Sequence, residues 1–302
     1  MKYRTLGRTD LRVSVIGIGT WQFGGEWGRS FKQGEVDAIL DRAAEAGINL
    51  IDTAECYGDH LSERLIGDYL SRRERDKWVV ATKFGHRYRG FMDREERFEP
   101  EDVREQLAAS LKALRTDKID LYQFHSGSDE AFLDDRVRDV LEEARRAGEV
   151  RHLGVSIRGA GSEVQARAAS ALGYGVLQVA YNRTDLRAES EVFPFVRRQR
   201  LGVLARVPLA SGFLGGRYGL LDKFGKDDYR STLEREEVAR RVREAERFAA
   251  EDVPEGVSPV RWALAWCLRD PAVTAVIPGV KTPEQAAENA AAADLLSAPW
   301  LL

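Results

Sequence analysis

The chain has 302 residues, of which 31% are charged and 43% hydrophobic, and its formal net charge is −3. This composition is ordinary for a soluble globular protein, and so small a charge gives no reason to expect a nucleic acid or an anionic membrane as partner. Two cysteines cannot build a disulfide framework and suit a reducing cytoplasm, where we expect the protein, with neither a signal peptide nor a membrane span.

The chain begins with a predicted β-hairpin over residues 2–14, which turns at residues 7–10. After it, one theme recurs: a short apolar run, a loop, and an amphipathic stretch rich in Ala, Glu and Arg. The predicted strands are 15–19, 48–52, 78–82, 119–124, 152–155, 176–180, 203–207 and 273–277. The predicted helices are 35–46, 62–72, 100–115, 135–147, 162–172, 189–199, 234–251, 258–269 and 282–293.

This alternation predicts an α/β protein built from parallel βαβ units. Eight such units close most readily into a (β/α)8 or TIM barrel. A doubly wound open sheet is the alternative, but it normally carries a glycine-rich phosphate turn after its first strand. The segment Gly17-Ile18-Gly19-Thr20-Trp21-Gln22-Phe23-Gly24 lacks that spacing. Because no Pro-, Gly- or Ser-rich linker divides the chain, we expect residues 1–302 to form a single domain.

Candidate catalytic residues stand where the predicted strands end, which is where chemistry sits in such barrels. Asp52 and Tyr57 follow the second strand, Lys83 the third and His125 the fourth. We expect Lys83 to lower the pKa of the Tyr57 phenol from about 10 toward neutrality. Asp52 would hold Lys83 charged, and His125 would steer a substrate carbonyl oxygen toward the Tyr57 hydroxyl.

Each of these four residues, taken alone, has an ordinary structural explanation, such as a loop cap or a satisfied core aromatic. Four chemically distinct polar groups at successive strand ends are hard to explain by packing, so we interpret them together as a proton-donor site. No metal is expected, because Cys56 and His60 are too few for a metal cage and the other histidines lack ligand spacing.

Three motifs connect these residues to a known family. Ile51-Asp52-Thr53-Ala54-Glu55-Cys56-Tyr57-Gly58 resembles the signature of the aldo-keto reductase superfamily. Ala81-Thr82-Lys83 and Asp120-Leu121-Tyr122-Gln123-Phe124-His125 resemble its lysine and histidine motifs. The likeness runs nearly end to end and includes the hairpin, which in that family closes the bottom of the barrel. The resemblance implies NADPH-dependent, reversible reduction of aldehydes or ketones, with Tyr57 as the proton donor.

Further motifs concern the cofactor, NADPH or NADP⁺. The glycine-rich loop 208–217 could cradle a pyrophosphate with its backbone N–H groups. Lys281 stands before a predicted helix N-terminus, which is either an ordinary Thr-Pro helix start or a phosphate site. The resemblance implies that this site takes the adenosine 2′-phosphate and that Ser156 and Gln178 hold the nicotinamide carboxamide. The expected cofactor residues are Gly19, Thr20, Trp21, Asp52, Ser156, Gln178, Arg206, Pro208, Leu209, Ser211, Gly212, Leu214, Arg217, Gly279, Lys281, Gln285, Glu288 and Asn289.

Two positions depart from the family pattern. Ile157 stands where many members carry an asparagine that also holds the carboxamide, and Arg206 stands where many carry a tyrosine stacked on the nicotinamide. A guanidinium cannot lie unpaired against an apolar helix layer, so we expect Arg206 to point into the barrel mouth. There it could stack on the nicotinamide, or it could pair with a carboxylate or a cofactor phosphate.

The expected partner is a small carbonyl substrate, and the oligomeric state stays open between monomer and homo-oligomer. The mouth loops contain aromatic residues that form an apolar rim or merely pack the loops: Trp21, Phe23, Trp27, Tyr88 and Phe91. The charged segment 87–97 is expected to be a solvated loop. The alternative function is a catalytically slow NADP(H)-binding sensor or regulatory subunit on the same fold.

Overall fold

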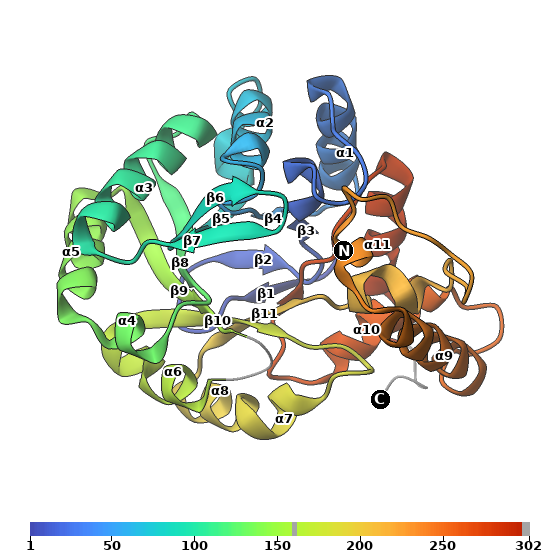
Figure 1. The fold of residues 1–302 in the computed structure, drawn as a ribbon. Helices are drawn as coiled ribbons and strands as arrows, with labels where there is room; N and C mark the ends of the chain where they lie inside the picture. The colour runs from blue at the N-terminus through green and yellow to red at the C-terminus, as the bar shows by residue number, and fades with distance from the viewer. Residues whose placement is uncertain (159–161, 298–302) are drawn as a thin grey trace.

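The computed structural model describes residues 1–158 and 162–297. Within these residues, eight parallel strands form one sheet in the order β12-β11-β10-β9-β8-β5-β4-β3. The sheet curls into a ring surrounded by helices (Figure 1). The strands are β3 (Ile18–Gly19), β4 (Leu50–Asp52), β5 (Val79–Phe84), β8 (Ile119–His125), β9 (Val150–Ser156), β10 (Tyr174–Ala180), β11 (Gly202–Arg206) and β12 (Ala275–Val276).

The first and last strands of the sheet meet, which closes the ring. Isolated bridges pair Ile16 with Val276 and Gly19 with Gly279. Glycine is needed at position 19, because a Cβ there would lie 2.6 Å from the Ile277 carbonyl oxygen. The predicted (β/α)8 barrel is therefore confirmed.

The N-terminal hairpin plugs the bottom of the barrel, as predicted. Its strands are β1 (Tyr3–Thr5) and β2 (Arg12–Ser14), and both appear inside the ring in Figure 1. The buried side chains of Leu6, Leu11 and Val13 pack on the residues that face the barrel interior, which are Leu50, Val79, Ala81, Leu121, Val176, Leu204, Ala275 and Ile277. Alternate strand residues face the opposite way and build the larger core under the helices.

The helices follow the predicted order with small differences. The predicted helix 189–199 is divided at Val192, because Pro194 has no amide hydrogen and begins a new helix instead of continuing the old one. The predicted helix 162–172 ends in a 3₁₀ segment, Ala169–Leu172. The helices are α1 (Gln33–Glu45), α2 (Leu61–Leu70), α3 (Pro100–Leu114), α4 (Asp129–Leu133), α5 (Asp135–Ala147), α6 (Glu163–Ala168), α7 (Arg187–Glu191), α8 (Phe193–Gln199), α9 (Arg235–Glu251), α10 (Pro259–Arg269) and α11 (Pro283–Leu295).

The main departure from the prediction follows β5. The expectation of a solvated loop at 87–97 is wrong, because β6 (His86–Gly90) and β7 (Asp93–Glu96) form an antiparallel hairpin. The groups that order this hairpin come from a distant part of the sequence. Buried Glu26 accepts a hydrogen bond from the Met92 amide at 2.9 Å and forms an ion pair with Arg94.

The plug makes a testable contribution to stability. Leu6→Ala is expected to lower the free energy of unfolding by about 2–5 kcal/mol, because Leu6 is fully buried and its truncation leaves a cavity. Arg8→Ala in the exposed turn is the control and should change stability by less than about 0.5 kcal/mol. Denaturant unfolding measures both, and a Leu6→Ala midpoint equal to that of the parent would contradict the structural role of the plug.

Candidate active site

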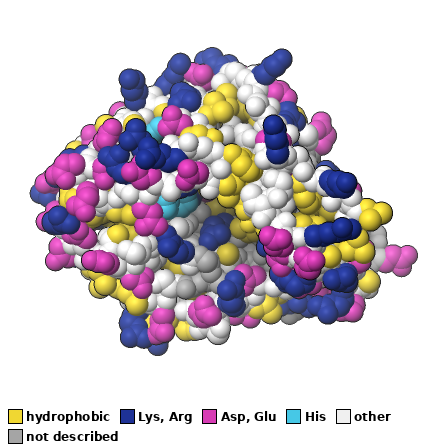
Figure 2. All heavy atoms as spheres, viewed as in Figure 1, with side chains coloured by type: hydrophobic (Ala, Val, Ile, Leu, Met, Phe, Trp, Pro, Cys, Tyr) yellow, Lys and Arg dark blue, Asp and Glu magenta, His cyan; other side chains and the backbone are white. Residues whose placement is uncertain are grey.

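A cavity of about 580 Å³ opens at the C-terminal ends of the barrel strands. Figure 2 shows a hollow in this face, with a basic side chain inside it and histidine at its edge. The cavity extends from Tyr57 at one end to Asn289 on α11 at the other. This volume is typical of small-molecule and cofactor sites.

A buried lysine organises one end of the cavity. Lys83 on β5 is fully buried, and its Nζ atom donates to Asp52 Oδ1 at 2.7 Å and to the Thr53 carbonyl at 2.6 Å. The third hydrogen bond reaches the Tyr57 hydroxyl at 3.2 Å. All three donors of the ammonium group are therefore used, which fixes Lys83 beneath the phenol.

The second oxygen of Asp52 is held by two amides. Gln178 Nε2 donates to Asp52 Oδ2 at 2.7 Å, and Gln123 Nε2 donates to the same atom at 3.1 Å. Ser156 Oγ in turn donates to Gln178 Oε1 at 3.4 Å. Gln178 and Ser156 thus join the Asp52 network, and Gln123 is a member that sequence reasoning missed. These hydrogen bonds replace the water that a buried carboxylate loses.

The pKa shifts at this end follow from burial and charge. Burial lowers the pKa of Lys83, but Asp52 and Tyr57 raise it more, so the group stays cationic. Burial raises the pKa of Tyr57 to about 12, which outweighs the opposing effect of Lys83. The predicted shift of this phenol toward neutrality is therefore wrong. Tyr57 keeps its proton at neutral pH and can donate it.

His125 and Trp21 flank the phenol. The His125 and Tyr57 rings are perpendicular, at 83° with centroids 6.3 Å apart, and Trp21 lies within 24° of parallel to Tyr57 at 6.1 Å. His125 Nδ1 lies 3.8 Å from Cys56 Sγ. Burial first, and the charge of Lys83 second, hold the pKa of His125 well below its usual value, so the imidazole is neutral.

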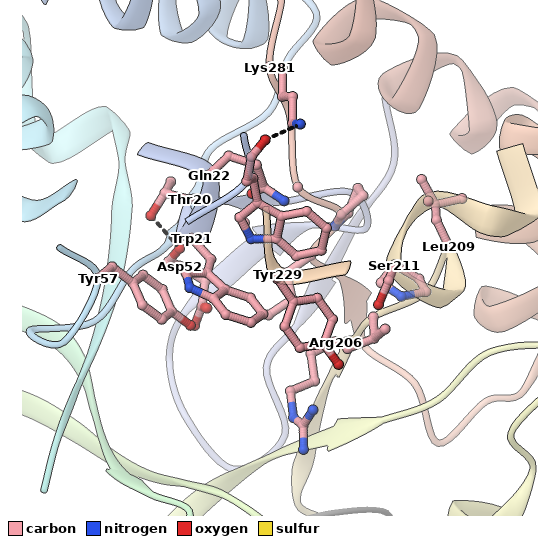
Figure 3. A pocket seen from close by; sticks show the side chains of 18 of the residues that line it. Thr20, Trp21, Gln22, Asp52, Tyr57, Arg206, Leu209, Ser211, Tyr229 and Lys281 are labelled. Carbon is pink, nitrogen blue, oxygen red and sulfur yellow. Dashed lines mark hydrogen bonds between the residues drawn. The ribbon is translucent and has the colours of Figure 1, made fainter. Parts of the chain in front are cut away.

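The other end of the cavity contains Lys281 and residues of α11. Figure 3 shows Lys281 far from Tyr57, with its Nζ atom donating to the Trp27 carbonyl at 2.6 Å. Gln285 Oε1 accepts from the Lys281 amide at 2.8 Å, and Glu288 forms an ion pair with Arg261 at 2.6 Å. The expected residues Gly279, Lys281, Gln285, Glu288 and Asn289 all line this end.

The loop after β11 forms one wall between the two ends. Val207, Ala210 and Ser211 have positive φ angles of 56°, 47° and 61°, which bend the chain sharply. The expected residues Pro208, Leu209, Ser211, Gly212 and Arg217 line the cavity, as do Gly19, Thr20 and Trp21 opposite. The Leu214 side chain instead packs in a separate core cluster with Phe213 and residues of α9 and α10.

Residues 228–230 form a strap that crosses the mouth beyond this loop. An antiparallel bridge pairs Trp27 with Asp228, and the Tyr229 amide donates to the Glu26 carbonyl at 2.8 Å. The Tyr229 ring lies 5.2 Å from that of Trp21 (Figure 3). Tyr229 was not predicted as a site residue, because no local sequence pattern indicates that its loop returns across the barrel. Other cavity-lining residues missed from the sequence include His86, Met92, Arg94, Arg230 and Arg241.

Arg206 and Ile157, the two departures from the family pattern, contact each other. Arg206 lines the cavity, and its NH2 group donates to the Ile157 carbonyl at 3.1 Å, whereas the Ile157 side chain is buried in the core. Stacking of Arg206 on a nicotinamide stays a prediction. Of the expected aromatic rim, Trp21 and Trp27 line the cavity and Phe23 lies in the core.

Two further observations bear on function. Among the described residues, no three His, Cys, Asp or Glu side chains gather as a metal site. In the same part of the chain, no helix is both long and apolar enough to cross a bilayer.

The buried ion pair yields a stability prediction. Asp52→Asn keeps the size of the side chain but leaves the Lys83 ammonium without its counter-charge, so the free energy of unfolding should fall by about 3–5 kcal/mol at pH 7. The pKa of Lys83 is raised in the folded protein, so its stabilisation is present below the unfolded lysine pKa of about 10.4. The deficit should therefore persist through neutral pH and shrink as the pH rises above that value.

Asp59→Asn makes the same chemical change at an exposed position and serves as the control. Urea unfolding of the parent and both variants at several pH values measures the effect. Coincident curves for the parent and Asp52→Asn would show that the buried pair does not stabilise the fold.

Comparison with known proteins agrees with this arrangement. The sequence model of the aldo/keto reductase family matches residues 15–298. The chain is 31% identical over 303 residues to YqkF, an uncharacterized oxidoreductase of Bacillus subtilis (strain 168), which covers 97% of this chain and 92% of the relative. It is 31% identical over 316 residues to the NADH-specific methylglyoxal reductase of Escherichia coli (strain K12), with coverages of 98% and 94%.

Solved structures show the same relationship. The holo form of aldo-keto reductase AKR11C1 from Bacillus halodurans superposes with a TM-score of 0.80 at 28% identity, covering 97% of this chain and 91% of that one. The glycerol dehydrogenase AKR11B4 from Gluconobacter oxydans superposes with a TM-score of 0.79 at 26% identity, with coverages of 98% and 95%. This chain therefore belongs to the aldo/keto reductase family.

Proposed function

We propose that this protein reduces aldehydes or ketones to alcohols with NADPH, using Tyr57 as the proton donor. Membership of an oxidoreductase family supports the general reaction. The observation that carries the proposal is the buried Asp52–Lys83–Tyr57 chain, which ends in a protonated phenol at the wall of the cavity. Such an arrangement stores one proton next to one fixed positive charge.

The proposed roles of the chain's own groups follow from their contacts. When bound, the dinucleotide supplies a hydride to the carbonyl carbon. Tyr57 then gives its proton to the carbonyl oxygen, and Lys83, at 3.2 Å, stabilises the phenolate that remains. Asp52 keeps Lys83 charged and oriented. Neutral His125 positions the carbonyl oxygen by a hydrogen bond, and solvent restores the proton on Tyr57.

Residues at both ends of the cavity suit the two halves of a nicotinamide dinucleotide. Asn289 Nδ2 at the far end is buried and has no hydrogen-bond partner within the described chain, so it is a donor that a ligand would satisfy. We propose that Gln285, Glu288 and Asn289 hold the adenine end, and that Lys281 takes the 2′-phosphate. Ser156 and Gln178 would hold the carboxamide, and the 208–217 loop would contact the pyrophosphate through its backbone.

We further infer that residues 1–302 act as one domain and that the protein works in the cytoplasm. The hairpin packs inside the barrel, which makes the N-terminal segment part of the same core. Cys56 and Cys267 are both buried and unpaired, which suits a reducing compartment. We infer the NADPH preference only from Lys281. The relatives do not support it, because one of them is named as NADH-specific.

The proton-donor role is tested by Tyr57→Phe. This variant should lose about 10²–10⁴-fold or more in turnover of an aldehyde, because only the phenol hydroxyl donates the proton, while its NADPH affinity stays nearly unchanged. Tyr3→Phe, whose hydroxyl bonds the Gly47 carbonyl at the other end of the barrel, is the control. Steady-state rates and fluorescence titration with NADPH measure the two effects. Retained activity in Tyr57→Phe would refute the mechanism, and a parent without turnover would favour the sensor alternative.

Cofactor preference is tested by Lys281→Ala. One charge-assisted contact to a phosphate contributes about 1.5–3 kcal/mol, so NADPH affinity should fall roughly ten- to a hundredfold while NADH affinity changes much less. Lys118→Ala, which removes a surface ion pair with Asp76, is the control. Fluorescence titrations with both cofactors decide the matter. Equal losses for NADPH and NADH would mean that Lys281 acts through its bond to the Trp27 carbonyl and not through the phosphate.

A further inference from the structure

A buried carboxylate stands behind the wall of the cavity at its catalytic end. Glu26 is 2% exposed and is not a lining residue, whereas Trp21 is one. The indole N–H of Trp21 donates to Glu26 Oε2 at 2.7 Å. This N–H group is therefore used behind the wall, while the ring lies beside that of Tyr57, with centroids 6.1 Å apart. The proposed proton transfer makes no use of Glu26.

The carboxylate of Glu26 is itself held by the β6–β7 hairpin. Its Oε1 atom accepts a hydrogen bond from the Met92 amide at 2.9 Å, and its Oε2 atom forms an ion pair with Arg94. The Arg94 guanidinium also donates to the carbonyl groups of Gly90 and Asp93, at 2.9 and 2.8 Å. Both carboxylate oxygens and both terminal nitrogens of the guanidinium are thus fixed, as a buried ion pair requires.

The backbone at Glu26 serves a different part of the site. Its carbonyl accepts a hydrogen bond from the Tyr229 amide at 2.8 Å. The carbonyl of the next residue, Trp27, accepts from the Lys281 ammonium group, and the same residue forms the bridge to Asp228. Main-chain groups therefore hold the strap and the end of the cavity that contains Lys281. A change of the Glu26 side chain leaves these bonds in place, so its effects should be confined to the catalytic end.

We propose that Glu26 is a positioning residue, which holds the Trp21 ring in the orientation in which it contacts the group next to the reacting carbonyl. The inference rests on the proposed function. When the carbonyl oxygen lies at the Tyr57 hydroxyl, the group attached to the carbonyl carbon lies against Trp21. Without Glu26 the indole turns its N–H toward another partner, because an unmade hydrogen bond to a buried donor is costly. The ring then no longer offers the same face to the substrate.

Benzaldehyde and acetaldehyde test this inference, because the first offers Trp21 a flat ring and the second only a methyl group. The test variant is Glu26→Met combined with Arg94→Met, which removes the acceptor and leaves no buried charge unpaired. The ratio of kcat/KM for benzaldehyde to that for acetaldehyde should fall about three- to tenfold, while NADPH affinity stays nearly unchanged. Arg104→Met combined with Glu143→Met removes an exposed ion pair in the same way and should keep the parent ratio.

A second comparison shows whether Glu26 acts through Trp21. The same double change is made in Trp21→Phe, which has an aromatic ring but no N–H group for Glu26 to hold. There the ratio should change by less than about twofold. A full fall in this background would mean that the effect comes from Arg94, which lines the cavity, or from the hairpin, and would overturn the inference.

The remaining outcomes separate this inference from the proposed function. An unchanged ratio, or equal losses for both aldehydes, overturns the positioning role while carbonyl reduction stands, because a merely structural change lowers both rates alike. Weaker NADPH binding as the sole change would place Trp21 against the cofactor and also overturn it. A parent that reduces neither aldehyde overturns the proposed function and this inference together. If thermal unfolding shows that the double variant does not fold, Glu26→Leu combined with Arg94→Leu replaces it, and the same fall in ratio is expected.

Discussion

The buried ion pair between Lys83 and Asp52 is the interaction on which the rest of the site depends. Two charges removed from water are tolerable only when every remaining donor and acceptor is satisfied. The barrel meets this condition by closing: β4 supplies the carboxylate, β5 the ammonium, and β8 and β10 the two amides that hold the second oxygen. The closed barrel brings these four strands around one carboxylate, so the ion pair depends on the fold.

Much of this arrangement could be predicted from the sequence, because it depends on strand ends. Parallel strands in a barrel deliver their C-terminal residues to one mouth, so Asp52, Lys83 and His125 converge once the strands are placed. The hairpin itself was predictable from its turn and short strands, whereas its place at the bottom of the barrel followed from the resemblance to the family and not from its own residues.

Other features could not be predicted from local pattern. The β6–β7 hairpin reads as a charged loop because its ordering partner, Glu26, lies more than sixty residues earlier and is buried only in the folded protein. The strap with Tyr229 depends on a bridge to Trp27, again far away in sequence. The direction of the Tyr57 pKa shift could not be predicted, because a neighbouring cation is visible in the sequence, whereas the depth of burial that opposes it is not.

The hairpin's attachment has a consequence for how this protein could diversify. Glu26 and Glu55 anchor the hairpin, because both accept hydrogen bonds from backbone amides and Glu26 also forms an ion pair with one arginine. Backbone amides are present whatever the side chain. Substitutions along 86–92 can therefore reshape one wall of the cavity without loosening the strands that carry the ionic core. Under the proposed function, the reacting groups and this wall of the cavity lie on separate pieces of chain, so selection can alter the second while it leaves the first alone.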